Sequence, residues 1–238
     1  MPAGEPTVEP TTSTNQPAGP LPTWVAYALV FGTSAAVLVL EITSLRLIAP
    51  YVGITLETNT AVIGLALTAI AVGAWSGGAA ADRISPRAMI GPLLVIGGAF
   101  VLVVTPAIRV STASVGRGDS APVALLVATV TVFVPAALLS AVPPMVVKLV
   151  LSTLTETGSV VGRLSGVSTL GAILATFLTG FVLVAVVPTS VILLGTGTLL
   201  VLGGIAFVVA SRRRGVAPHV GVTAAVVLAL VAGLGVLL

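Results

Sequence analysis

A single acidic residue stands inside the first long apolar run of the chain. Glu41 comes about 17 residues into that run, which corresponds to about 25 Å of rise along a helix. A carboxylate in the outer half of a bilayer is costly, and it marks a functional position by default. Glu41 would bind a cation or carry a proton. The alternative interpretation is a structural ion pair, or a carboxyl that reaches the membrane surface.

Three more polar residues near the end of this run are candidates for the same binding site. Arg46 lies five residues after Glu41, about 140° around a helix, so the two side chains do not share a face well. Glu57 and Asn59 follow in the next loop and could line the mouth of a cavity. An ordinary solvated loop is the simpler interpretation of both.

Two short polar segments follow further along. The first, Gly78-Ala-Ala-Ala-Asp82-Arg83-Ile-Ser-Pro-Arg87, can cap and clamp the helix ends beside it. It resembles the loop signature of major facilitator transporters, where the role is conformational coupling. In the second, Pro143 and Pro144 predict a helix break. The next residues, 145–154, predict a short interfacial helix on which Lys148 either reaches the surface or belongs to a broken-helix transporter site.

Composition determines the class of protein that must hold these residues. Of the 238 residues, 57% are hydrophobic and 7% are charged, and the mean hydropathy is +1.21. Soluble domains carry about 25% charged residues, so most of this surface must face lipid. Without cysteine, and with His219 as the single histidine, we expect no disulfide and no metal site. The sequence holds no catalytic or cofactor-binding motif, and no basic-aromatic stripe for nucleic acid.

The apolar runs predict an all-α, polytopic membrane protein. Residues 1–22, rich in Pro and Thr, predict a disordered tail, and residues 23–238 predict one helical membrane domain. Each run has about the 20 residues that a membrane helix needs, and Pro188 marks the turn between the fifth and sixth. Small residues, including Gly73-x-x-x-Gly77 and Gly162-x-x-x-Gly166, allow close helix packing. The seven predicted spans are residues 24–48, 59–81, 88–109, 122–142, 161–187, 189–210 and 219–238.

Basic residues predict the orientation in a plasma (inner) membrane. Seven of the ten Lys and Arg residues fall in loops on the side of the N-terminus, and three fall on the other side. This bias predicts a cytoplasmic N-terminus. Seven spans would then place the C-terminus outside, whereas one re-entrant run would reverse that end. The seven are Arg83, Arg87, Lys148, Arg163, Arg212, Arg213 and Arg214, and the three are Arg46, Arg109 and Arg117.

Several separated motifs resemble one known family in order. The segment Glu41-Ile-Thr-Ser-Leu-Arg46-Leu-Ile-Ala-Pro50-Tyr-Val-Gly53 is similar to the first-helix signature of bacterial membrane-bound spermidine synthases, which are described as fused major facilitator and spermidine synthase proteins. Further matches cover about residues 30–200. They are Val62-Ile-Gly64, Gly73-Ala-Trp-Ser-Gly77-Gly78 with Ala81-Asp-Arg83, Pro143-Pro-Met-Val-Val-Lys148, Gly162-Arg-Leu164 with Ser168-Thr-Leu-Gly171, and Thr176-Phe-Leu-Thr-Gly-Phe181.

The resemblance implies a membrane domain that resembles half of a major facilitator fold and anchors a soluble aminopropyltransferase domain. In that family the soluble domain carries the catalytic residues. None of its motifs occurs in this sequence, so no catalytic residue carries over, and whether the chain belongs to an enzyme stays open. The domain would bind or pass polyamines, with Glu41 as the cation site. The alternatives are an independent half-transporter for a small cation, working as a homodimer, and a purely structural anchor.

Overall fold

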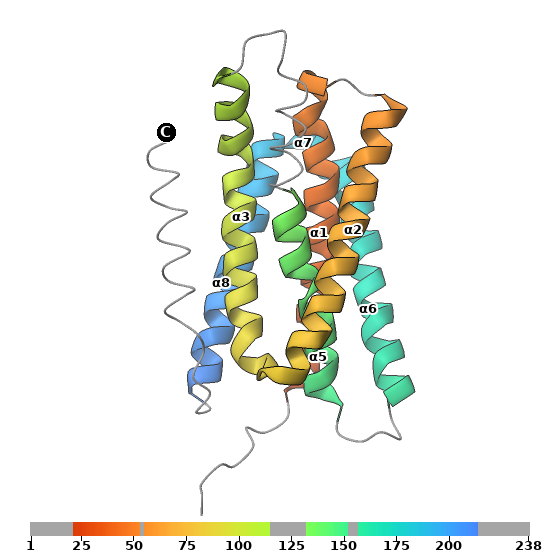
Figure 1. The fold of residues 1–238 in the computed structure, drawn as a ribbon, viewed down its shortest axis with the longest axis vertical. Coiled ribbons are helices and arrows are strands. Elements are labelled where there is room, and N and C mark those ends of the chain that lie inside the picture. The colour runs from red at the N-terminus through yellow and green to blue at the C-terminus, as the bar shows by residue number, and fades with distance from the viewer. Residues whose placement is uncertain (1–20, 53–54, 115–131, 152–156, 214–238) are drawn as a thin grey trace, which may run out of the picture.

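The computed structural model describes residues 21–52, 55–114, 132–151 and 157–213, and it is helical throughout these ranges. Six of the described helices are long and apolar enough to cross a membrane (Figure 1). The elements are α1 (Thr23–Val52), α2 (Leu56–Arg83), α3 (Pro86–Ser114), residues 132–140 with α5 (Val142–Val150), α6 (Thr157–Phe177), the π-helix η2 (Leu178–Leu183), α7 (Val184–Val186) and α8 (Thr189–Arg212).

Six membrane-length helices in the described residues confirm the all-helical membrane class. The predicted seventh span, residues 219–238, and most of the predicted tail, residues 1–22, lie outside the described residues. Pro188 does separate the fifth and sixth spans, because α7 ends at Val186 and α8 begins at Thr189.

The fourth span ends later in the chain than predicted. Within the described residues it runs from Val132 to Val150, whereas the sequence predicted a span at 122–142. Pro143 and Pro144 do interrupt the helix, at Ala141, but they occupy the first turn of α5, where a missing N–H costs little. A short helix does follow the prolines, with Met145 and Val146 buried in the core, and its predicted interfacial position stays a prediction.

The six spans alternate in direction, and their pairing is regular (Figure 1). The third span packs most extensively on the sixth (α3 on α8), and the first packs on the fifth (α1 on α6). The second span contacts the fourth (α2 on α5), and the first contacts the fourth and the sixth. Because α1 and α6 both rise from the same end of the bundle, they pack as a parallel pair.

Glycines bring α3 and α8 into close contact. A Cβ built on Gly98 would lie 2.8 Å from the carbonyl oxygen of Gly197, and one on Gly204 would lie 2.9 Å from that of Gly91. The pairs are seven residues apart on each helix and run in opposite directions. Without side chains at these positions the two backbones approach closely enough for van der Waals packing to hold the helices together.

In two further close helix contacts, glycines lie on only one of the two helices. The Gly73-x-x-x-Gly77 motif of α2 packs against the backbone of Ala137 and Ala141 in the fourth span. Gly171 of α6 packs against the backbone of Phe31 in α1. The interpretation of Gly73 and Gly77 as packing residues is therefore confirmed. The second predicted motif, at residues 162–166, differs, because Gly162 and Gly166 meet open space.

Large apolar side chains are exposed on α2, α6 and η2. Trp75 of α2 is 78% exposed, and Phe181 of η2 is 75% exposed with its ring stacked on that of Phe177. Of the six described spans, the fifth buries the smallest share of its surface. Such faces are stable in lipid and would not be in water. The fifth span is thus attached to the bundle mainly along one side, through α1.

Candidate functional site

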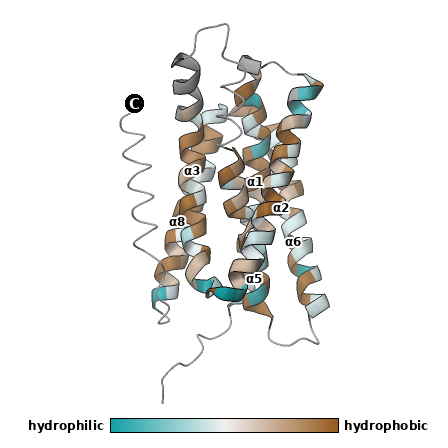
Figure 2. Cartoon of the chain, viewed as in Figure 1, coloured by the Kyte–Doolittle hydropathy of each residue, from teal (hydrophilic) through white to brown (hydrophobic). Residues whose placement is uncertain are grey.

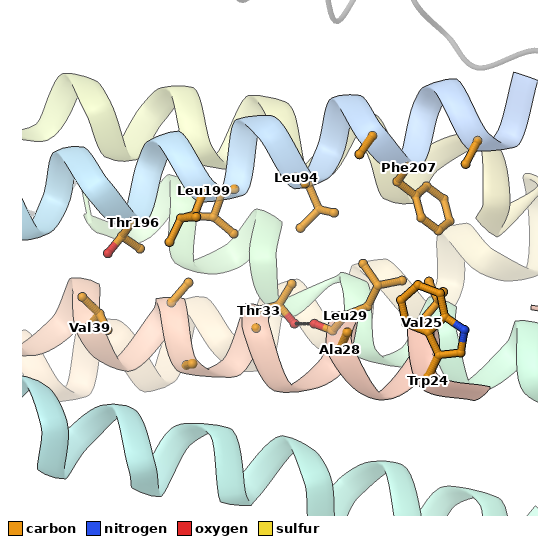
Figure 3. A pocket seen from close by; sticks show the side chains of 17 residues that line it. Trp24, Val25, Ala28, Leu29, Thr33, Val39, Leu94, Thr196, Leu199 and Phe207 are labelled. Atoms are coloured by element: carbon orange, nitrogen blue, oxygen red, sulfur yellow. Dashed lines mark hydrogen bonds between the residues drawn. The ribbon is translucent and has the colours of Figure 1, made fainter. Parts of the chain in front are cut away.

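The larger of two cavities lies between α1, α3 and α8 and is unsuited to a charged ligand. Its volume is about 650 Å³, and apolar side chains such as Trp24 and Phe207 line most of it (Figure 3). Among its lining residues the hydroxyls belong to Thr33 and Thr196, and each donates to a carbonyl of its own helix, to Leu29 at 2.8 Å and Ile192 at 2.9 Å. No charged side chain of the described residues lines this cavity.

The smaller cavity lies where α1, α2, the fourth span and α6 meet, and it has a different lining. Its volume is about 340 Å³, and it carries hydroxyl side chains from three of these four helices. The hydroxyl oxygens of Ser34 on α1 and Ser168 on α6 lie 2.5 Å apart and share a hydrogen bond. Pro143 and Pro144 also line it. The other hydroxyl residues in the lining are Thr33, Ser140 and Thr169.

Glu41 continues the α1 stripe that lines this cavity. Seven residues make about two helical turns, so Glu41 lies almost directly above Ser34 on the same face. Leu38, in the lining between them, is one turn below Glu41. The carboxylate is half-buried, and no described residue forms an ion pair or hydrogen bond with it. Glu41 therefore lies inside a span, as the sequence predicted, and two turns beyond a residue that lines the polar cavity.

The other predicted ligand residues are not part of the cavity lining. Arg46 and Glu57 are exposed, and Asn59 is half-buried near the start of α2. The separation of Arg46 from Glu41 agrees with their predicted angle around the helix, because no ion pair joins them in the described structure. A role for Glu57 and Asn59 at a cavity mouth stays a prediction.

The structure connects the two polar segments that the sequence left separate. Lys148 of α5 donates a hydrogen bond to Asp82 at the end of α2, with 2.5 Å between Nζ and Oδ1. Arg83 beside it is exposed, whereas Arg87 in the first turn of α3 is only 5% exposed. Lys148 lies one turn beyond Pro144 on the fourth span. The ion pair therefore joins the second and fourth spans at the end of the bundle below the cavity.

This ion pair is expected to contribute little to the stability of the bundle and more to the selection of the fourth span as the partner of the second. Exposed ion pairs are weak and are screened by salt, so Asp82→Asn should lower the Tm in detergent slightly, and less at high salt. Asp82→Lys should lower it further, because two ammonium groups then face each other. Adding Lys148→Asp should restore it. A large loss for Asp82→Asn that persists at high salt would contradict this assignment.

The sequence interpretation missed the hydroxyl residues of the cavity. Ser34, Ser140 and Ser168 occur in apolar spans, where an isolated serine is an ordinary packing residue. A weak signal was present, since Ser34 precedes Glu41 by one heptad. The contact of Ser34 with Ser168, which lies 134 residues away in the chain, has no local signal.

Comparison with known proteins does not assign the chain to a family. No protein-family model, curated protein or solved structure matches it. Within the described residues there is also no group of His, Cys, Asp and Glu side chains that could hold a metal ion. The cavity and Glu41 are therefore the features that indicate a function.

Proposed function

We propose that this chain is the membrane domain of a spermidine-synthase-like protein, and that it binds or passes a small organic cation such as a polyamine. The observation that carries the proposal is the half-buried carboxylate of Glu41, which extends the stripe of α1 that lines the hydroxyl-rich cavity. In a low-dielectric setting a carboxylate without a protein partner attracts a cation strongly. The motifs around Glu41 and Arg46 support the choice of a polyamine.

The pairing of the helices supports a likeness to half of a major facilitator transporter. Suppose that the first, second and third spans are exchanged with the fourth, fifth and sixth. The contact between the first and fifth spans then becomes the contact between the fourth and second spans, which the structure also contains. The same exchange converts the contact of the first and sixth spans into that of the fourth and third. Because the first and fourth spans run in opposite directions, this is the pattern of an inverted repeat, whose substrate site lies between the repeats near the bilayer midplane.

The test is calorimetric binding of putrescine and spermidine to the purified chain in detergent. Wild type should bind saturably, and Glu41→Gln should bind about ten- to a hundredfold more weakly, because a hydrogen bond to a charged group contributes about 1.5–3 kcal/mol. Asp82→Asn, which removes an exposed carboxylate at the C-terminal end of α2 and outside the cavity lining, is the control and should bind like wild type. No binding by any of the three would remove the cation site and leave a structural anchor.

A second candidate is an independent half-transporter that works as a homodimer. The exposed apolar faces of α2 and α6 favour it, since these two helices flank the cavity and a second copy could cover it. Uptake of labelled putrescine by liposomes that contain only this chain would support this candidate over an anchored module.

The surface charge supports the predicted orientation in a plasma membrane. Arg83, Arg87, Lys148 and Arg212 lie at the end of the bundle where α1 begins (Figure 2). Cytoplasmic ends of membrane proteins are enriched in Lys and Arg. We therefore propose that this end, with the N-terminus, faces the cytoplasm.

A further inference from the structure

Two buried hydroxyl groups in the described structure have no hydrogen-bond partner. Ser44 of α1 and Thr179 of η2 are both 0% exposed, and neither hydroxyl oxygen is bonded. Buried side-chain hydroxyls are normally satisfied, and leaving one unsatisfied costs about 1–3 kcal/mol. Two such groups on contacting elements need an explanation.

Their state differs from that of other hydroxyl residues in the described helices. Seven threonines donate to the carbonyl oxygen four residues earlier in their own helix, which is the usual solution in an apolar setting. Thr43, beside Ser44, is one of them, with a bond of 2.6 Å to Val39. Ser44 and Thr179 do not use this solution. The seven are Thr33, Thr43, Thr60, Thr68, Thr169, Thr176 and Thr196.

The π-helix η2 provides the local setting for Thr179. The backbone N–H of Val184 donates to the carbonyl oxygen of Thr179, five residues earlier, so the turn is wider than an α-helical one. Turns of this kind are frequent at functional sites. Thr179 thus stands at the one described place in the fifth span where the regular hydrogen-bond pattern changes.

Helical spacing places both hydroxyls above the smaller cavity. Ser44 lies seven residues after Val37, and Thr179 lies seven residues after Ala172; Val37 and Ala172 both line that cavity. Seven residues add about 10.5 Å of rise with little rotation. Because α1 and α6 run parallel and α1 contacts η2, both hydroxyls lie at a similar height along the same helix pair. Glu41 is one turn from Ser44 on α1.

Glu41, Ser44 and Thr179 together offer one negative charge and three acceptor groups with four oxygen atoms. A primary ammonium group carries one positive charge and three N–H donors. We infer that these three residues bind the terminal ammonium group of the ligand, while its carbon chain extends toward the hydroxyl-lined cavity. This inference rests on the proposed function and adds the residues and the chemical group that confer selectivity.

The experiment measures binding of methylammonium, putrescine and tetramethylammonium by calorimetry, together with the Tm without ligand. Ser44→Ala and Thr179→Val should each weaken binding of methylammonium and putrescine about tenfold, which corresponds to about 1.4 kcal/mol. Their Tm without ligand should equal or exceed that of wild type, because each variant removes an unsatisfied hydroxyl. Tetramethylammonium, which has no N–H donor, should not bind.

The matched control is Thr176→Val, one turn earlier on the same helix, where the hydroxyl is exposed and bonded to Ala172 at 2.9 Å. It should bind like wild type. If Glu41→Gln loses binding but Ser44→Ala and Thr179→Val do not, the hydroxyl site is overturned and the proposed function stands. Stabilisation by Na⁺ without any effect of methylammonium would overturn the ammonium assignment. Absence of binding by wild type would overturn both.

Discussion

Gly73→Leu is expected to lower the unfolding temperature of the bundle more than any surface substitution. A Cβ at position 73 would lie 2.1 Å from the carbonyl oxygen of Ala137 and 2.8 Å from its carbonyl carbon. Those atoms are backbone, so the fourth span would have to move as a unit. Overpacking of this kind costs about 1–3 kcal/mol and sometimes more. The measurement is the fraction of monodisperse protein that remains after heating in detergent.

The matched control for this prediction is Gly64→Leu on the same helix. Gly64 has open space where its Cβ would be, and leucine is a better helix former than glycine by up to about 1 kcal/mol. Gly64→Leu should therefore leave the Tm unchanged or raise it slightly. Equal Tm values for Gly73→Leu and wild type would mean that α2 and the fourth span do not approach as closely as described.

Gly171→Leu is expected to reduce both stability and cation binding. A Cβ at position 171 would lie 2.5 Å from the carbonyl oxygen of Phe31 and 3.0 Å from its Cα. Separating α6 from α1 would break the hydrogen bond between Ser34 and Ser168 and loosen the contact of η2 with α1. Binding of putrescine should therefore fall by at least about tenfold, or about 1.4 kcal/mol, measured by calorimetry at a temperature where the variant is still folded.

Gly166→Leu is the control, since it changes the same helix at a position that meets open space. It should leave both the Tm and putrescine binding unchanged. If a folded Gly171→Leu variant binds like wild type, then binding does not depend on the α1–α6 contact.

The spans were predictable wherever hydrophobicity alone determines them. Five of the predicted runs overlap described spans closely, because each needs only about 20 apolar residues. The end of the fourth was placed too early, since Pro143 and Pro144 ended the apolar run in the sequence. The structure uses them to begin α5 within the same span. Whether a proline ends a helix or starts its next segment depends on the packing of residues such as Met145, which no local pattern reveals.

The site was predictable only in part, for a similar reason. Glu41 stands out because a charge in an apolar run is costly. The partnership of Asp82 with Lys148 joins residues 66 positions apart, and helical spacing rules do not reach that far. Ser44 and Thr179 were missed because serine and threonine usually bond to their own helix. Their lack of a hydrogen-bond partner can be recognised only in the three-dimensional structure.

The one-sided attachment of the fifth span determines where the bundle can open. The α3–α8 pair is held by glycine contacts along its length, and the second span is fixed to the fourth by Gly73, Gly77 and the Asp82–Lys148 pair. The fifth span depends chiefly on α1. Movement of the fifth span away from α1 would break the hydrogen bond between Ser34 and Ser168 and open the hydroxyl-lined cavity between these helices. The residues proposed to bind the cation and the helix contact that covers the cavity thus belong to the same interface.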